Sequence, residues 1–256
     1  MTPVLRLMEG LTSRPARFED VDAIAGLIAA CEVEDDGVVE VDRDDIASEL
    51  SVPALDLDRD TLLVFDAGAL VAWAQVKRAG AFVDVDVHPA HRGRGIGMAL
   101  MRWTEEAARA AGGTFVRQST DANAGAAVLL TRGGYEGRWT SWILEIALDA
   151  ILEPRRPEGV DVRQFDPGRD DMPVYRLIED AFDWEGRGSQ TFEDWKATTI
   201  ARERFDPSTS PVALVGDEIV GAALSLDYGT EAEGHVDQLA VAKRHRGRVV
   251  PRLAFQ

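Results

Sequence analysis

The sequence predicts an α/β (α+β) fold in which helices flank a mixed central sheet, with one complete copy followed by a partial repeat. Three observations lead to this prediction. Helical and strand patterns alternate along the first 150 or so residues, a segment rich in Pro and Gly interrupts them, and the same order of patterns then begins again. A period of about 150 residues is that of a duplicated domain rather than of a short structural repeat.

The first half begins with two predicted helices and a hairpin. Apolar residues at helical spacing follow an acidic start in Phe18–Cys31, and a second helix is expected at Asp42–Leu50. The segment Thr61–Val76 is typical of a hairpin that turns at Asp66–Gly68, and Ala81–Val87 is typical of a strand. The elements expected after Gly97 are a helix at 98–112, a strand at 114–120, a helix at 122–135 and a strand at 139–148.

The second half repeats the same order as far as the strand before the second Arg-Gly-Arg stretch. Helices are expected at Phe165–Phe182 and Thr191–Phe205, a hairpin at Pro211–Leu226 and a strand at Gly234–Val241. The segment Glu153–Gly159 has the composition of a linker. We therefore expect a domain at 11–150, a linker at 151–159, and a second domain at 160–256 that is truncated after strand 4.

Composition excludes several classes of function. The net charge of −17 argues against nucleic acid or an anionic membrane as a partner, because either requires a basic face. Cys31 is the only cysteine, so an internal disulfide or a thiolate metal cluster is excluded, and no metal is expected. No apolar run reaches the ~18 residues of a membrane span, and the N-terminus lacks the pattern of a signal peptide. We expect a cytoplasmic protein that could form a homo-oligomer.

A glycine-rich turn joins the strand Ala81–Val87 to the next helix. Gly93, Gly95 and Gly97 permit tight backbone angles there, and the free N–H groups of a helix start bind anions. Arg92 and Arg94 add positive charge to an otherwise acidic chain. The alternative is a turn that only connects a strand to a helix. The Walker and dinucleotide-binding patterns do not fit, because the Lys of the first and the third Gly of the second are missing.

The spacing within this stretch resembles the acyl-CoA-binding motif R/Q-x-x-G-x-G/A of the GNAT superfamily of N-acetyltransferases. Arg92, Gly95 and Gly97 occupy its fixed positions, and the order of elements over residues 11–148 is similar to the family fold. A second family signature is matched by Asn123 and by residues up to Tyr135, although Asn123 also suits a helix cap. The resemblance implies that acetyl-CoA is bound by these residues: Val85, Asp86, Val87, Arg92, Gly93, Arg94, Gly95, Ile96, Gly97 and Asn123.

The catalytic pattern of the family is incomplete in this sequence. Leu130 stands where members often carry the Tyr that protonates the departing thiolate, and Ala81–Phe82 lacks the Glu base of many members. Asp86 is the candidate catalytic residue, and the alternative for both Asp84 and Asp86 is a solvated strand face. By the same resemblance, the acidic loop after the first helix would line the acceptor pocket with Glu32, Glu34 and Asp35, unless it is only a solvated loop.

The stretch Val241–Pro251 repeats the Arg-Gly-Arg of the first turn but has Val249 and Pro251 in place of two glycines. The second half resembles tandem-domain members of the superfamily, mycothiol synthase among them, and we expect it not to bind CoA. The resemblance implies an acetyl-CoA-dependent N-acetyltransferase that acts on a small amine by direct attack. The alternative is a non-catalytic module that binds acyl-CoA.

Overall fold

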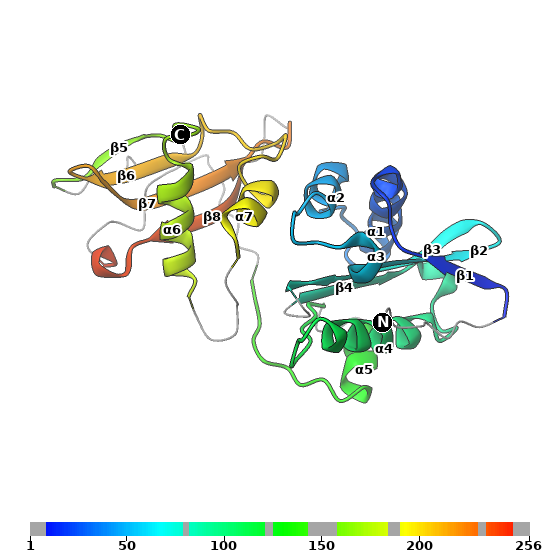
Figure 1. Ribbon diagram of the computed structural model, residues 1–256. Helices are drawn as coiled ribbons and strands as arrows, with labels where there is room; N and C mark the ends of the chain where they lie inside the picture. The colour runs from blue at the N-terminus through cyan, green and yellow to red at the C-terminus, as the bar shows by residue number, and fades with distance from the viewer. Residues whose placement is uncertain are drawn as a thin grey trace. The chain divides into compact units, whose positions relative to one another are not determined.

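A computed structural model describes residues 9–78, 82–120, 125–142, 158–183, 190–229 and 234–247, and the chain divides into units at residues 1–138 and 139–256. Each unit contains one four-stranded sheet, in the orders β1-β2-β3-β4 and β5-β6-β7-β8 (Figure 1). This confirms the predicted α/β class and its repetition. The paired strands of both sheets are antiparallel wherever the structure describes them.

In the first unit, helices cover both faces of the sheet (Figure 1). Side chains alternate along the strands, so Leu63 and Trp73 pack with α1 and α2, while Val64 and Ala72 pack with α4. The elements are β1 (Leu11–Arg14), η1 (Phe18–Asp20), α1 (Val21–Asp35), α2 (Arg43–Leu50), α3 (Leu57–Asp60), β2 (Thr61–Asp66), β3 (Ala69–Lys77), β4 (Phe82–Val87), η3 (Pro89–His91), α4 (Ile96–Ala110) and α5 (Gly125–Arg132).

Local sequence explains where these elements begin and turn. Asp42 caps α2 by accepting hydrogen bonds from the backbone N–H groups of Asp44 and Asp45. Ala67 and Gly68 both have positive φ and form a two-residue turn between β2 and β3, within the segment where a turn was expected. The short elements β1 and α3 were not predicted, because four residues show too little periodicity.

The strand predicted at 114–120 is not formed. A single backbone hydrogen bond, from Val83 N–H to the Arg117 carbonyl at 2.8 Å, joins this segment to β4, and one bond does not make a ladder. The described strand pairs are therefore all antiparallel, and no parallel pair of the predicted mixed sheet is formed by this segment. Residues 143–148 of the last expected strand lie outside the described residues, as do residues 151–157 of the expected linker.

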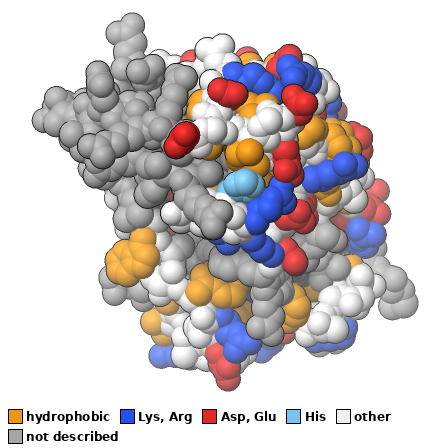
Figure 2. All heavy atoms as spheres, turned by 90° about the vertical axis from the view of Figure 1, so that its left-hand side faces the viewer, with side chains coloured by type: hydrophobic (Ala, Val, Ile, Leu, Met, Phe, Trp, Pro, Cys, Tyr) orange, Lys and Arg blue, Asp and Glu red, His pale blue; other side chains and the backbone are white. Residues whose placement is uncertain are grey.

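The second unit has helices on one face of its sheet in the part that the structure describes. Val212, Leu224 and Trp195 form its core with α6. Leu239 on the opposite face is 60% exposed. Charged groups of both signs are interspersed on the side of the molecule that Figure 2 shows. The elements are β5 (Asp161–Gln164), α6 (Asp171–Ala181), α7 (Phe192–Thr198), β6 (Pro211–Val215), β7 (Glu218–Leu226), β8 (His235–Val241) and η5 (Lys243–His245).

The helix predicted at Thr191–Phe205 is shorter than expected. Its start is as expected, because the Thr191 hydroxyl accepts the N–H of Asp194 at 3.1 Å. It ends at Thr198, since Thr199 leaves helical geometry with φ −129° and ψ −87°. A run of β-branched residues from Thr198 to Ile200 explains the early end, because such residues lose side-chain freedom in a helix. The strand β5, like β1, was not predicted.

Candidate functional site

Strand β4 presents two different faces and one open edge. Val83, Val85 and Val87 pack toward α4, whereas Asp84 and Asp86 lie on the face covered by α1 and α2. The N–H of Val83 points away from β3, toward Arg117. By the two-residue alternation of a strand, the N–H and carbonyl of Val85 point to the same open edge. These groups have no partner among the residues that the structure describes.

The turn after β4 holds its predicted shape through two glycines. Gly93 and Gly95 have φ of +75° and +82°, which side chains rarely adopt, and an added β-carbon would meet open space at either position. Gly95 is also the N-cap of α4, so the unpaired N–H groups of a 15-residue helix begin there. The turn is therefore a potential anion site made of backbone groups.

Gly97 has a different role from the other two glycines. It lies in the first turn of α4, and a β-carbon there would lie 3.2 Å from Leu129 Cδ2 and 3.8 Å from Val87 Cγ2. The missing side chain lets α4 pack closely against α5 and β4. Ile96 beside it is buried in the core.

The two arginines of the turn are engaged with carboxylates. Arg92 binds Asp35 through two nitrogens at 2.6 and 2.8 Å, and its Nε donates to the Val87 carbonyl at 3.1 Å. Arg94 binds Asp66 at 2.8 Å. The positive charge that the sequence suggested for an anion is therefore balanced locally, and the arginines fix the turn to α1 and to the β2–β3 hairpin.

Asp86 is the unpaired carboxylate of this region. Burial raises its pKa to about 7, with further contributions from the negative charges of Asp84, Glu32 and Asp35, while Arg92 opposes the shift. Within the part of the chain that the structure describes, its carboxylate has no hydrogen-bond or ion-pair partner. A carboxylate with a pKa near neutrality can accept and release a proton at physiological pH.

Asp84 belongs to an ion-pair network that sequence reasoning did not find. Lys77 Nζ lies 2.5 Å from Glu49 Oε1 and 2.6 Å from Asp84 Oδ2, and so joins α2 to β3 and β4. Burial and the carboxylates of Asp84 and Glu49 act oppositely on Lys77, and the net effect raises its pKa. A Lys at the end of an apolar strand was the signal that could have pointed to this network.

The acidic loop residues take three separate positions. Glu32 accepts the backbone N–H groups of Glu40 at 2.9 Å and Val41 at 3.2 Å, so it holds the loop between α1 and α2. Asp35 is the partner of Arg92, and Glu34 is exposed. The structure brings Glu32 and Asp35 near Asp86 but does not place Glu34 there.

The remaining candidates do not supply a proton donor. Leu130 is buried, and the Tyr135 hydroxyl donates to Glu105 Oε1 at 3.2 Å, where burial and Glu105 raise its pKa. Cys31 is buried, and burial raises its thiol pKa to about 11, so the thiol is not activated as a nucleophile. Asn123 and Ala81 lie outside the described residues. The described residues contain no group of His, Cys, Asp and Glu that could hold a metal, and none of their helices could cross a membrane.

The turn after β8 keeps part of the geometry of the turn after β4. Arg246 Nε donates to the Val241 carbonyl at 3.0 Å, as Arg92 does to Val87, and Gly247 has φ +75° like Gly93. Val249 and Pro251 lie outside the described residues. On β8, the strand register places Ala240 where β4 has Asp86.

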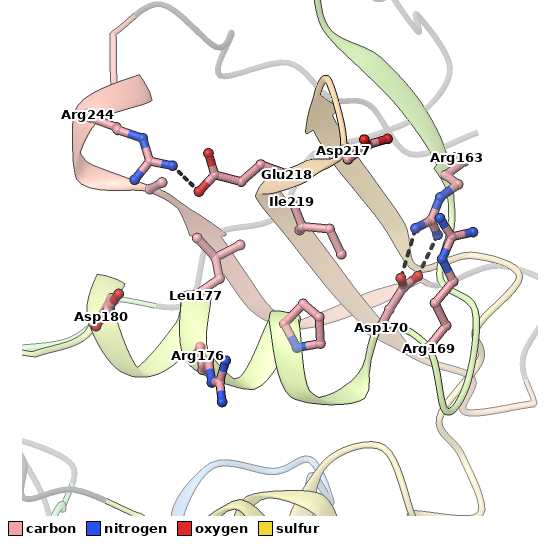
Figure 3. Close-up of a pocket in the computed structure, with 12 residues that line it drawn as sticks. Arg163, Arg169, Asp170, Arg176, Leu177, Asp180, Asp217, Glu218, Ile219 and Arg244 are labelled. Atoms are coloured by element: carbon pink, nitrogen blue, oxygen red, sulfur yellow. Dashed lines mark hydrogen bonds and ion pairs between the residues drawn. The ribbon is translucent and has the colours of Figure 1, made fainter.

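A cavity of about 400 Å³ lies beside this second turn (Figure 3). Arg244 is paired with Glu218, and Arg163 with Asp170, around Leu177. Acidic and basic groups therefore neutralise one another among the lining residues, and the charges select neither a polyanion nor a polycation.

Residues 22–135 match the model of the acetyltransferase (GNAT) family. A mycothiol acetyltransferase of Amycolatopsis mediterranei (strain U-32) is 33% identical over 162 residues, covering 60% of this chain and 52% of that protein. The chain spans about half the length of the curated relatives it matches.

Two solved structures resemble both units. A GCN5-related N-acetyltransferase from Sphaerobacter thermophilus matches with a TM-score of 0.67 and 29% identity, covering 95% of this chain and 79% of that one. A tandem GNAT protein from the clavulanic acid biosynthesis pathway matches with a TM-score of 0.63 and 19% identity, covering 93% and 81%.

Proposed function

We propose that this chain is an N-acetyltransferase that uses acetyl-CoA as acyl donor, because residues 22–135 match the model of the acetyltransferase (GNAT) family. The observation that carries this proposal is the continuous path from the open edge of β4, through the Gly93–Gly95 turn, to the N-terminus of α4. Backbone groups at the edge can pair with an extended amide chain, and those of the turn and helix start can bind a diphosphate.

Residues from Arg92 to Gly97 would hold the diphosphate mainly through backbone N–H groups, since both arginine side chains have protein partners. The N–H and carbonyl of Val85 would pair with the pantetheine arm. Acetyl-CoA supplies an activated acetyl thioester at the end of that arm. Positioning of this group beside the acceptor accounts for most of the expected rate.

Asp86 is the proposed proton acceptor for the amine. The acceptor nitrogen forms a bond to the acetyl carbon, the carbon–sulfur bond breaks, and the amine loses one proton. Asp86 takes that proton directly or through water, and the CoA thiolate is protonated by solvent because Leu130 cannot donate. The acidic surroundings formed by Glu32, Asp35 and Asp84 favour a cationic acceptor.

Release of free CoA thiol from acetyl-CoA, measured against a panel of small amines and aminoglycosides, tests this function. Relatives named mycothiol acetyltransferase make the amine precursor of mycothiol one member of the panel. Amine-dependent thiol release supports the proposal. Tight acetyl-CoA binding with no release for any amine would instead support a non-catalytic acyl-CoA-binding module, which the buried Leu130 in place of a proton donor favours.

A further inference from the structure

Two acceptor groups on one face of the first sheet lack hydrogen-bond donors. Gln75 is 1% exposed, and its Oε1 is buried without a partner in the described part of the chain. Asp86, on the neighbouring strand, also lacks one. Gln75 pairs directly with Asp84, so Asp86 is its diagonal neighbour on the same face. Diagonal neighbours lie roughly 7–8 Å apart, a gap that one small group between the two side chains can bridge.

The cations of this region are already occupied. Lys77 lies between Glu49 and Asp84, and Arg92 binds Asp35 and the Val87 carbonyl. Gln75 Oε1 has lost its hydration and gains no bond in return, whereas the half-buried Asp86 carboxylate carries an unbalanced charge. The two acceptors therefore mark a place for a ligand that is cationic and carries several N–H donors.

The second unit shows the same place without these acceptors. The strand register puts Leu224 at the position of Gln75 and Ala240 at that of Asp86. The residue at the position of Asp84 is Gln238, and its amide oxygen accepts Trp195 Nε1 at 3.1 Å while its Nε2 donates to Thr199 Oγ1 at 3.2 Å. Both unpaired acceptors thus occur together in one unit and are replaced together in the other.

We propose that Gln75 Oε1 and the Asp86 carboxylate together bind a primary ammonium group, that of the acceptor substrate. The inference rests on the proposed acetyl transfer, and it makes Gln75 a specificity-determining residue that selects primary amines over fully alkylated ones. A primary ammonium offers three N–H donors, enough for both oxygens, while a quaternary ammonium offers the same charge and none.

Binding of methylammonium and tetramethylammonium to the full chain, without acetyl-CoA, tests the subsite. Thermal stabilisation is measured at pH 8 and equal ionic strength, because a ligand of the folded state stabilises it according to its affinity. We expect methylammonium to stabilise the protein and tetramethylammonium to do so at least about tenfold more weakly. The variants Gln75→Leu and Asp86→Ala carry the residues of the second unit, and Glu136→Gln, an exposed carboxylate, is the charge-matched control.

Gln75→Leu is expected to weaken methylammonium binding about fivefold and Asp86→Ala more than tenfold, since hydrogen bonds to a charged acceptor are the stronger ones. Glu136→Gln is expected to leave it unchanged. Equal stabilisation by both cations, or an unchanged methylammonium effect in Gln75→Leu and Asp86→Ala, would overturn the subsite. Failure of the proposed function is distinguishable, because it would appear as absent thiol release from bound acetyl-CoA while selective methylammonium binding persisted.

Discussion

The two units share a framework and differ in the chemistry placed on it. Both sheets have the same strand order, and both carry an irregularity at the same place in the second strand, after Val64 and after Ala213. Both fix their first strand to the following helix with a two-bond Arg–Asp pair, Arg14–Asp20 and Arg163–Asp170. Residues that set backbone geometry are thus repeated.

The difference lies along the fourth strand of each sheet. In the first unit this strand carries Asp84 and Asp86, and Lys77 and Glu49 extend the line of charges. In the second unit the corresponding line is neutral, with Gln238 bonded to Trp195 and Thr199. A few substitutions on one strand face therefore separate a charged, unsatisfied site from a satisfied core without changing the fold.

The largest expected effect comes from replacing Gly95 of the first turn with valine, the residue that the second turn carries at the same position as Val249. Gly95→Val puts a β-branched residue at φ +82°, where the backbone has to move and the N–H groups at the start of α4 are displaced. We expect acetyl-CoA affinity, measured by calorimetry, to fall by at least about 100-fold. Gly112→Val is the matched control, because Gly112 has φ +88° and equally open surroundings at the other end of α4. Unchanged affinity in Gly95→Val would show that glycine geometry is not what separates the two turns.

Asp86→Asn removes the charged feature that most clearly separates the two strands. We expect the rate of acetyl transfer to fall roughly 100-fold, within the usual range for a general base, with acetyl-CoA affinity nearly unchanged. The wild-type rate should rise with pH through about 7, the pKa that burial gives Asp86. In Asp86→Asn the rate should no longer increase with pH in this range. A full rate in Asp86→Asn would leave proton transfer to water alone.

The sequence predicted much of this comparison but not its side-chain partners. The alternation of Val and Asp in β4 and the three glycines after it sufficed to place the strand and the turn, and they are the basis of the candidate site. Periodicity reports which face a residue lies on, so it identified Asp84 and Asp86 but not the ion pair with Lys77 or the missing donor of Gln75. Those facts depend on which strands become neighbours, and Gln75 and Asp84 meet only through the β3–β4 register.

The Asp86 carboxylate should make the stability of the first unit depend on pH. Ala240, at the same position of the second unit, cannot produce this effect. Burial, Asp84, Glu32 and Asp35 raise the Asp86 pKa from 3.8 to about 7 against the effect of Arg92. Between these pH values the folded state alone holds the proton, so stability falls as pH rises across the window and levels above it. We expect Asp86→Asn to raise the free energy of unfolding at pH 8 by ~2–4 kcal/mol and hardly at all at pH 4. Calorimetric unfolding at the two values measures this, and equal gains would contradict a titrating Asp86.

The smallest expected difference concerns the feature that the two units share. Asp170 is 2% exposed at its side chain and Asp20 is 14% exposed, so the hydrogen bonds of the second pair are better shielded from water. We expect Asp170→Ala to destabilise its unit by about 3 kcal/mol and Asp20→Ala by about 2 kcal/mol, since each carboxylate accepts two charge-assisted hydrogen bonds from its arginine.

Replacing the exposed pair Arg43–Asp22 through Asp22→Ala is the control for surface charge, and it should cost under about 1 kcal/mol. Hydrogen exchange of β1 and β5 assigns each loss to its own unit. Equal costs for Asp20→Ala, Asp170→Ala and Asp22→Ala would mean that the repeated pairs are not part of the framework. A larger cost confined to the two repeated positions would show that duplication preserved the contacts that hold each sheet to its first helix, while the fourth strand was free to change.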